Sequence, residues 1–296
     1  MKRSRNCSAD LPWRVLVTTQ RRAYAWSVII KGEGPQVTQA MPLKARLQAG
    51  KPALGCFLNM ANGMAAEICA RAGFDMVLID CEHGPGDITA AIQQMQAAQA
   101  GGCPAMVRVP WNDTVYLKRI LDAGAQGVMI PAISTAQEAQ AAVAACRYPP
   151  RGVRGIAYPI VRASGYGADL ATYLDKTVDE LLVMAQIETR AGVENAASIA
   201  GTEGVDLIFV GPMDLSASLG YFGQPDHPEV RKIIEGVKVK VKQAGKLIGI
   251  IPTPEFDARM LFGQGYDLVL DGADVAFLRD GALAKVRAVA DITGGK

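Results

Sequence analysis

Four apolar segments of the sequence each end in residues that can carry chemistry. His83 follows the first segment, and Arg108 closes the second. Glu188 follows the third, and Asp214 lies shortly beyond the fourth. If these segments are parallel strands of one sheet, their carboxyl ends meet at a common edge. Two carboxylates, an arginine and a histidine would then share one site, which suits a reaction that moves a proton and stabilises an oxyanion.

Glu188 and Asp214 predict a metal site. A carboxylate at the rim of a buried sheet is costly unless it is paired or binds a cation. No histidine or cysteine of a zinc site lies near either residue in sequence, which favours a hard ion such as Mg²⁺ or Mn²⁺. The alternative is a structural salt bridge, for instance from Glu188 to Arg190 or Arg108.

Arg108 and His83 also have structural alternatives. Arg108 could be an ion-pair partner, but its place at a strand end directs it into the site, where a planar cation suits a carboxylate or an enolate oxygen. A lone histidine is more often structural than catalytic, and the second histidine, His227, is predicted to start a helix. Asp80 and Glu82, however, stand beside His83 and can fix its tautomer for work as a general base.

Signals of other chemistries are absent from the sequence. It contains no G-x-S-x-G, P-loop or H-E-x-x-H motif. Carbonyl chemistry through a Schiff base needs a lysine, which in a barrel would stand at a strand's carboxyl end. Lys246 precedes a predicted strand and Lys118 lies inside a predicted helix. A metal-assisted route is therefore preferred to an imine route.

Eight apolar segments, separated by helical patterns, must position these residues. They lack polar alternation, as strands covered on both faces should. Eight βα units over about 240 residues predict an α/β fold, the (β/α)₈ TIM barrel. An open doubly wound sheet is the alternative, weakened by the missing G-x-G-x-x-G motif. The predicted strands are Leu54–Leu58, Met76–Asp80, Ala105–Val109, Gly127–Pro131, Leu182–Ile187, Leu207–Val210, Leu247–Ile251 and Leu268–Leu270. The predicted helices include Met64–Ala72, Ile88–Ala100, Val115–Asp122, Ala136–Ala145 and Pro228–Ala244.

One long connection of this predicted barrel is irregular. Residues 148–166, between the fourth and fifth strands, are rich in Gly, Pro and Arg. We expect them to form an ordered surface loop over the mouth of the barrel.

Charge is distributed unevenly along the chain. Residues 1–40 carry seven Lys/Arg and two Asp/Glu, out of 31 and 29 in the whole chain. The remaining residues therefore have a small acidic excess, which argues against a nucleic-acid partner. No apolar run approaches the roughly 20 residues that a membrane span needs, so no membrane partner is expected.

Residues 1–40 are expected to be a disordered extension or a mis-assigned start, with an organellar transit peptide as the alternative. Met41-Pro42-Leu43-Lys44 opens an amphipathic helix, so residues 41–296 are predicted to form a single barrel domain. The six cysteines form no C-x-x-C pair. They predict free thiols in a reducing compartment, the cytoplasm.

Seven motifs stand in order along the chain. They are D-x-E-H-G-P at 80–85, V-R-V-P at 107–110, L-D-A-G at 121–124, Y-P-P-R-G-V-R-G at 148–155, Q-I-E-T-R at 186–190, F-V-G-P-M-D-L-S at 209–216 and G-Q-P-x-H-P-E-V at 223–230. Together they resemble the HpcH/HpaI aldolase family, the class II pyruvate aldolases, over roughly residues 42–293. The resemblance implies a barrel of the phosphoenolpyruvate/pyruvate-domain type.

The same resemblance implies roles at the metal and the oxo-acid. Glu188 and Asp214 would hold the divalent metal, Mg²⁺ or Mn²⁺, with Co²⁺ as a further candidate. Gln186 and the backbone around Met213 and Asp214 would bind the oxo-acid substrate.

It also implies roles in proton transfer. Arg108 would steady the enolate, and His83 would be the proton acceptor. Asp122 would assist His83 by raising its basicity, and Asp80 would also assist His83. The spacing argument alone does not single out Asp122, which ends a predicted helix.

The implied reaction is the reversible cleavage of a 4-hydroxy-2-oxo acid to pyruvate and an aldehyde through a metal-bound pyruvate enolate. One alternative is an enzyme that decarboxylates oxaloacetate and traps the enolate, as in the macrophomate-synthase branch. A metal-binding barrel without catalysis is the non-enzyme alternative. The resemblance further implies a homo-oligomer, a hexamer built from dimers that exchange a carboxyl-terminal helix, for which Val275–Ala290 is the candidate.

Three positions depart from what the resemblance leads us to expect. Tyr158 is bulky and could reshape the aldehyde pocket. Asp271 places an acid at the last strand, where a neutral residue is expected. Ile251 makes the end of the seventh strand apolar, which suits a less polar aldehyde.

Overall fold

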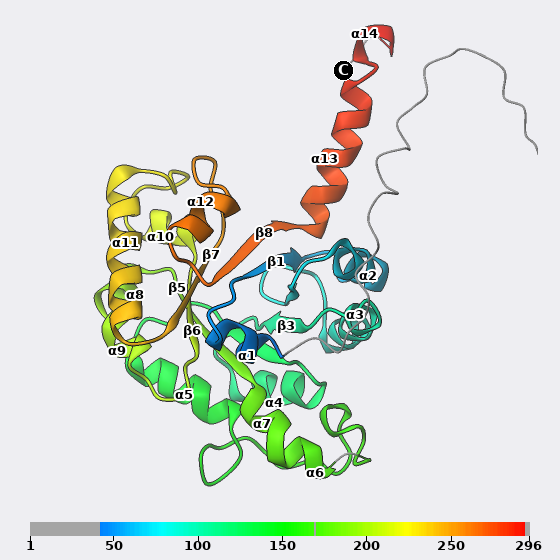
Figure 1. The fold of residues 1–296 in the computed structure, drawn as a ribbon, viewed down its shortest axis with the longest axis vertical. Helices are drawn as coiled ribbons and strands as arrows, with labels where there is room; N and C mark the ends of the chain where they lie inside the picture. Colours follow the sequence, from blue (N-terminus) through cyan, green and yellow to red (C-terminus); the bar gives the residue numbers. More distant parts are fainter. Residues whose placement is uncertain (1–41, 169, 294–296) are drawn as a thin grey trace, which may run out of the picture. The chain divides into compact units, whose positions relative to one another are not determined.

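Eight parallel strands follow one another around a closed barrel, with helical segments in the connections between them (Figure 1). The computed structural model describes residues 42–168 and 170–293. The predicted (β/α)₈ barrel is confirmed, and every predicted strand but the last agrees with the structure to within one residue at each end. The strands are β1 (Ala53–Leu58), β2 (Met76–Asp80), β3 (Ala105–Arg108), β4 (Gly127–Ile130), β5 (Leu182–Ile187), β6 (Leu207–Val210), β7 (Leu247–Ile250) and β8 (Leu268–Ala273).

The predicted helices are also present. Side chains that precede several of them accept backbone N–H groups of the first turn, among them Asn62, Asp87 and Thr135. The helices are α1 (Leu43–Gln48), α2 (Gly63–Ala72), α3 (Ile88–Ala100), α4 (Thr114–Asp122), α5 (Ala136–Cys146), η1 (Arg162–Ser164), α6 (Leu170–Thr172), η2 (Tyr173–Thr177), α7 (Val178–Glu180), α8 (Arg190–Glu194), α9 (Ala196–Ala200), α10 (Pro212–Ser218), α11 (Pro228–Gln243), α12 (Ala258–Gly263), α13 (Asp274–Arg287) and α14 (Ala290–Thr293).

Two apolar cores lie on the two faces of the strands. Successive side chains of a strand point to opposite faces. Val77 and Val107 therefore belong to the core between strands and helices. Leu78 and Met106 belong to the core inside the barrel. The interior core consists of Leu43, Leu47, Ala53, Met76, Leu78, Met106, Met129, Leu182, Met184, Leu207, Phe209, Leu268 and Leu270.

Helix α1 closes the amino end of this interior. Its Leu43 and Leu47 are buried in the interior core. Lys44 Nζ forms an ion pair with Asp206, just before β6, at 2.9 Å. The amino end is thus filled by apolar side chains, which leaves the carboxyl end of the barrel as the place for a site.

The irregular loop of residues 148–166 lies at this amino end, so its expected place over the mouth was wrong. It follows α5 and precedes β5, and a helix-to-strand connection returns to the end of the barrel where the strands begin. Arg154 within it pairs with Asp122 at the end of α4, at 2.6 Å. Tyr158 packs edge-on against Tyr148 with ring centroids 5.9 Å apart, away from the mouth.

Helix α13 leaves the barrel after β8 and runs away from it (Figure 1). Only its first residue, Asp274, is buried. The Asp274 carboxylate accepts the backbone N–H groups of Asn59 and Met60 at 2.8 and 3.2 Å, which ties the start of α13 to the end of β1.

Three sequence expectations concern features other than the barrel itself. Residues 1–40 lie outside the described residues, so the expected division of the chain at residue 41 stays a prediction. In the described part of the chain, no helix is both long and apolar enough to cross a membrane. The cysteines of that part are buried and free, as expected.

Candidate active site

Every second side chain of a strand faces the barrel interior. Near the carboxyl ends of several strands, the residues in this interior-facing row are polar. Leu78 faces the barrel interior, so Asp80, two residues further along β2, faces it as well. The same step places Arg108 on β3, Gln186 on β5 and Glu188 just after β5. All four side chains are buried. They form a polar layer above the apolar interior, at the end of the barrel where active sites of this fold lie.

A pocket of about 480 Å³ opens at this layer. That volume is within the range of small-molecule sites. Its wall combines side chains from several strand ends with apolar residues of β1, β6, β8 and α13 and of the segment just after β7. The pocket is lined by Phe57, Asn59, Asp80, His83, Arg108, Gln186, Phe209, Gly211, Met213, Asp214, Ile251, Pro252, Leu270, Asp271, Gly272, Ala273 and Ala276.

Arg108 is held by two carboxylates on one side of the pocket. Its Nε and Nη2 donate to the two oxygens of Asp80 at 2.9 and 2.7 Å. Its Nη1 lies 3.1 Å from Glu82 Oε2, and its guanidinium lies over the Phe57 ring at 5.0 Å. Burial alone would raise the pKa of Asp80, but the hydrogen bonds and charge of Arg108 outweigh it and lower that pKa. The pair is therefore ionised at neutral pH.

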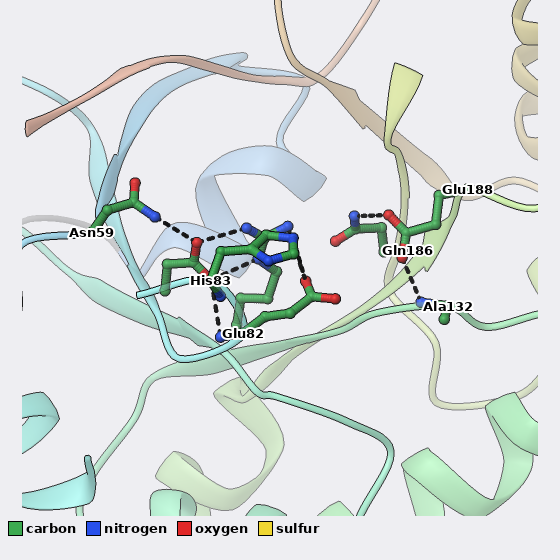
Figure 2. A network of polar contacts seen from close by, with 8 residues as sticks. Asn59, Glu82, His83, Ala132, Gln186 and Glu188 are labelled. Carbon is green, nitrogen blue, oxygen red and sulfur yellow. Dashed lines mark hydrogen bonds and ion pairs between the residues drawn. The ribbon is translucent and has the colours of Figure 1, made fainter. Parts of the chain in front are cut away.

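His83 stands at the rim beside this group (Figure 2). Its side chain is 62% exposed, and its Nε2 lies 3.8 Å from Glu82 Oε2. The backbone N–H groups of Glu82 and His83 donate to Asp80 Oδ1, which fixes the turn that carries the imidazole. His83 is thus reachable by a substrate and anchored at its backbone.

Glu188 forms a second polar group across from the first (Figure 2). One carboxylate oxygen accepts the backbone N–H of Ala132 at 2.8 Å, and the other accepts a short hydrogen bond from Gln186 Nε2. Burial raises the pKa of Glu188 to about 7, and the charges of Glu82 and Asp214 contribute to the rise. A bound cation would relieve both the burial and the repulsion.

Gly211, next to Glu188, keeps space open for such an ion. A Cβ at this position would lie 2.7 Å from Glu188 Oε2 and 3.0 Å from Gln186 Nε2. Gln186 Oε1 is buried without a hydrogen-bond partner. Among the described residues, no cluster of three or more His, Cys, Asp or Glu suits a metal. Two carboxylates, Glu188 and Asp214, together with the unpartnered amide oxygen of Gln186, suit a hard cation that takes its other ligands from water and substrate, as Mg²⁺ commonly does.

Comparisons with known proteins identify the family of this chain. Residues 53–280 match the family model of the HpcH/HpaI aldolase/citrate lyase family. The chain belongs to that family. It is 43% identical to a 4-hydroxy-2-oxo-heptane-1,7-dioate aldolase of Salmonella dublin over 81% of this chain and 91% of the relative. It is also 43% identical to a hydroxypyruvate/pyruvate aldolase of Chromohalobacter salexigens, over 83% of this chain and 96% of the relative.

A solved structure of the HpcH/HpaI family shows the same barrel. This family protein, from Burkholderia cenocepacia J2315, is 38% identical, with a TM-score of 0.79 over 83% of this chain and 98% of the other. Together with the named relatives, this likeness supports a carbon–carbon lyase of the aldolase type.

Within the HpcH/HpaI barrel of this chain, Asp122 does not meet His83. Helices of a βα barrel run back from the mouth, so the end of α4 lies at the amino end of the barrel, whereas His83 lies at the carboxyl end. The Asp122 carboxylate accepts instead from Arg154 Nη2 at 2.6 Å. The expected help from Asp122 is therefore not provided within one chain.

Two pocket residues were missed in the sequence. Asn59 follows β1, and its Nδ2 donates to Asp80 Oδ2 at 2.6 Å. Phe57 lies beneath the Arg108 guanidinium. The rule that barrel residues at strand ends are functional, applied to β1, would have pointed to Asn59.

Gly211→Ala tests the space beside Glu188. We expect the substitution to weaken divalent-metal and oxo-acid binding by roughly 10- to 100-fold, because its Cβ would press on Glu188 Oε2. Isothermal titration with Mn²⁺ and then pyruvate measures both affinities. Gly236→Ala, in the middle of α11 with open space around it, is the control and should leave them unchanged. Unchanged binding in Gly211→Ala would place the ion elsewhere.

Proposed function

We propose that this protein is a divalent-metal-dependent aldolase that reversibly cleaves a 4-hydroxy-2-oxo acid to pyruvate and an aldehyde. The observation that carries the proposal is the buried Glu188 carboxylate, whose pKa is raised to about 7 beside Asp214, in a site that also holds Arg108 and His83. The substrates in the names of the two aldolase relatives support the same class of reaction.

The residues that would hold the metal are Glu188 and Asp214. The bound ion, Mg²⁺ or Mn²⁺ with Co²⁺ as a further candidate, would act as a Lewis acid that polarises the substrate's oxygens. Gln186 Oε1, Gly211 and the backbone at Met213 line the space next to these carboxylates and would orient the oxo-acid.

Proton transfer falls to the opposite side of the pocket. In cleavage, His83 accepts the proton of the C4 hydroxyl, the C3–C4 bond breaks, and its electron pair becomes the enolate of pyruvate. The C4 oxygen leaves as the carbonyl of the aldehyde. Arg108, which Asp80 holds in place, stabilises the negative charge that develops on the enolate oxygen. A proton returned to C3 completes pyruvate.

Pyruvate release coupled to lactate dehydrogenase tests this function. The substrates 4-hydroxy-2-oxoheptanedioate, 2-dehydro-3-deoxyglucarate and oxaloacetate are offered separately, with Mg²⁺, with Mn²⁺ and after EDTA. We expect release from a hydroxy-oxo acid that depends on the metal. Release from oxaloacetate alone would favour decarboxylation with enolate trapping. Turnover that survives EDTA would contradict the metal site.

We further propose that the protein is a homo-oligomer, a hexamer built from dimers, in which α13 packs on a second copy. Several apolar side chains of α13 are exposed, which is typical of an interface. A contact between Asp122 and His83 would then join two copies. The exposed apolar residues are Val275, Phe277, Leu278, Leu283 and Val286.

The mass in solution tests this assembly. Light scattering of the full chain should give a multiple of 31.4 kDa. The double variant Leu278→Glu and Val286→Glu should lower that mass, since two buried charges without partners oppose association. Val239→Glu, on the exposed side of α11, is the control and should keep the mass. A monomeric wild-type protein would contradict the proposal.

A further inference from the structure

A β-bulge in β8 directs an additional acidic side chain into the pocket. Gly55 of β1 pairs with Leu270, but Phe57 pairs with Ala273, so β8 has two residues where β1 has one. The two are Asp271 and Gly272, and the φ of Gly272 is +81°, a conformation that glycine adopts without strain. Bulges of this kind re-aim a side chain. Asp271 consequently lines the pocket.

Among the described residues, no donor satisfies the Asp271 carboxylate. In the described part of the chain its carboxylate makes neither a hydrogen bond nor an ion pair. Burial raises its pKa, and the charge of Asp257, which precedes α12, raises that pKa further. Ile251 and Pro252, which line the same pocket, offer no side-chain donor. A half-buried acid in such surroundings is most stable when a ligand donates a hydrogen bond to it.

Among the described residues that line the pocket, none is a free cation that could pair with an anionic group. Apart from the rim residue His83, Arg108 is the basic residue on its wall, and Asp80 and Glu82 already pair with its guanidinium. The wall carries three acids, Asp80, Asp214 and Asp271. Once a metal takes Asp214, the acid left without a partner is Asp271. A carboxylate or phosphate brought beside it would meet repulsion without compensation.

We propose that Asp271 makes the enzyme select aldehydes whose far end is an uncharged hydroxyl group over aldehydes that end in carboxylate or phosphate. This inference rests on the aldolase function proposed above. In the addition direction, the pyruvate methyl carbon loses a proton and bonds to the aldehyde carbon, whose oxygen gains a proton. The far end of the aldehyde takes no part in these steps and is free to donate its hydroxyl to Asp271. The aldehyde preference of this enzyme would thus differ from that of an aldolase that cleaves a 1,7-dioate, because the aldehyde released from such a substrate carries a carboxylate.

Two aldehydes of equal length test this inference. Succinic semialdehyde ends in a carboxylate and 4-hydroxybutanal in a hydroxyl. The kcat/KM of each is measured in aldol addition to pyruvate, with the metal-loaded full chain, for the wild type and Asp271→Asn. We expect the wild type to prefer 4-hydroxybutanal by roughly tenfold or more. Asp271→Asn should shift the ratio toward succinic semialdehyde by roughly tenfold, because the amide is isosteric and uncharged.

Two controls separate this inference from the proposed function. Glu255→Gln removes one charge from the exposed connection between β7 and α12, outside the pocket wall, and should leave the ratio within about twofold. Exchange of the pyruvate methyl protons with deuterium needs no aldehyde and should be equal in wild type and Asp271→Asn. Absence of exchange in the wild type overturns the proposed function and this inference with it. Normal exchange with an unchanged aldehyde ratio in Asp271→Asn, or a wild type that prefers succinic semialdehyde, overturns the role of Asp271 alone.

Discussion

Glu188→Gln is expected to lower aldolase turnover by roughly 1,000-fold or more. The substitution keeps the shape of the side chain but removes a charge that the metal requires, and Lewis-acid stabilisation contributes several kcal/mol to such a transition state. The same variant should lose the thermal stabilisation that Mn²⁺ gives the wild type. For the wild type, Mn²⁺ at about 100 times its Kd should raise Tm by roughly 5–10 °C. Coupled pyruvate release and thermal unfolding with and without EDTA measure both effects.

The same substitution should stabilise the metal-free protein at alkaline pH. The pKa of Glu188 in the fold is about 7, above its ordinary value of 4.5, because burial disfavours the charged form. A raised carboxyl pKa contributes stability below about pH 4.5, and this contribution is lost as the pH rises through 7. At pH 8 the ionised group costs roughly 3 kcal/mol, and Glu188→Gln removes that cost while losing one hydrogen bond worth about 1 kcal/mol. The variant should therefore gain roughly 2 kcal/mol at pH 8 and lose about 1 kcal/mol at pH 4.5, where only the missing hydrogen bond counts.

Chemical unfolding of the EDTA-treated proteins at the two pH values checks this sign. Glu194→Gln, on the exposed end of α8, is the matched control and should change neither stability nor turnover. Equal stability of Glu188→Gln and wild type at pH 8 would mean that Glu188 is not held as an unpaired buried carboxylate. Full turnover in Glu188→Gln would show that Glu188 does not take part in the reaction.

The strands and the residues at their ends could be predicted from the sequence because polar residues follow each short apolar run. The runs themselves do not show which side chains face the interior. Both faces of every strand are apolar, so Val77 and Leu78 look alike in sequence although they belong to different cores. The alternation becomes visible only at Asp80, where the interior row turns polar.

The sequence predictions were wrong or incomplete where the position of a residue depends on the direction of a helix or on an extra residue in a strand. Asp122 ends a helix, and only the antiparallel course of α4 shows that it lies at the amino end of the barrel. The loop of residues 148–166 was misplaced for the same reason. Asp271 was noted as an acid where a neutral residue was expected, but its entry into the pocket depends on the extra residue in β8. A change of pairing register of this kind leaves no signal in apolar periodicity.

Arg108→Lys is expected to lower kcat by roughly 100- to 1,000-fold while the charge of the side chain is kept. Arg108 uses Nε and Nη2 for Asp80 and presents Nη1 toward Glu82, so one planar group serves the carboxylates and the enolate oxygen together. A lysine ammonium is a single point donor and cannot reproduce this fork. The KM for the oxo-acid should change by less than tenfold, since the metal side of the pocket is untouched.

The pH dependence of the stability of Arg108→Lys shows whether a lower kcat comes from the changed geometry of this side chain or from unfolding of the protein. Arg108 lowers the pKa of Asp80, so the pair contributes stability above the ordinary aspartate pKa, and that contribution is lost as the pH falls through the lowered value. In Arg108→Lys, the weaker pairing should reduce stability at pH 7 by roughly 1–3 kcal/mol and make the loss toward pH 3 shallower. Arg119→Lys, exposed on α4, is the control for both measurements. A variant that keeps wild-type kcat would show that the charge alone, without the fork, stabilises the enolate.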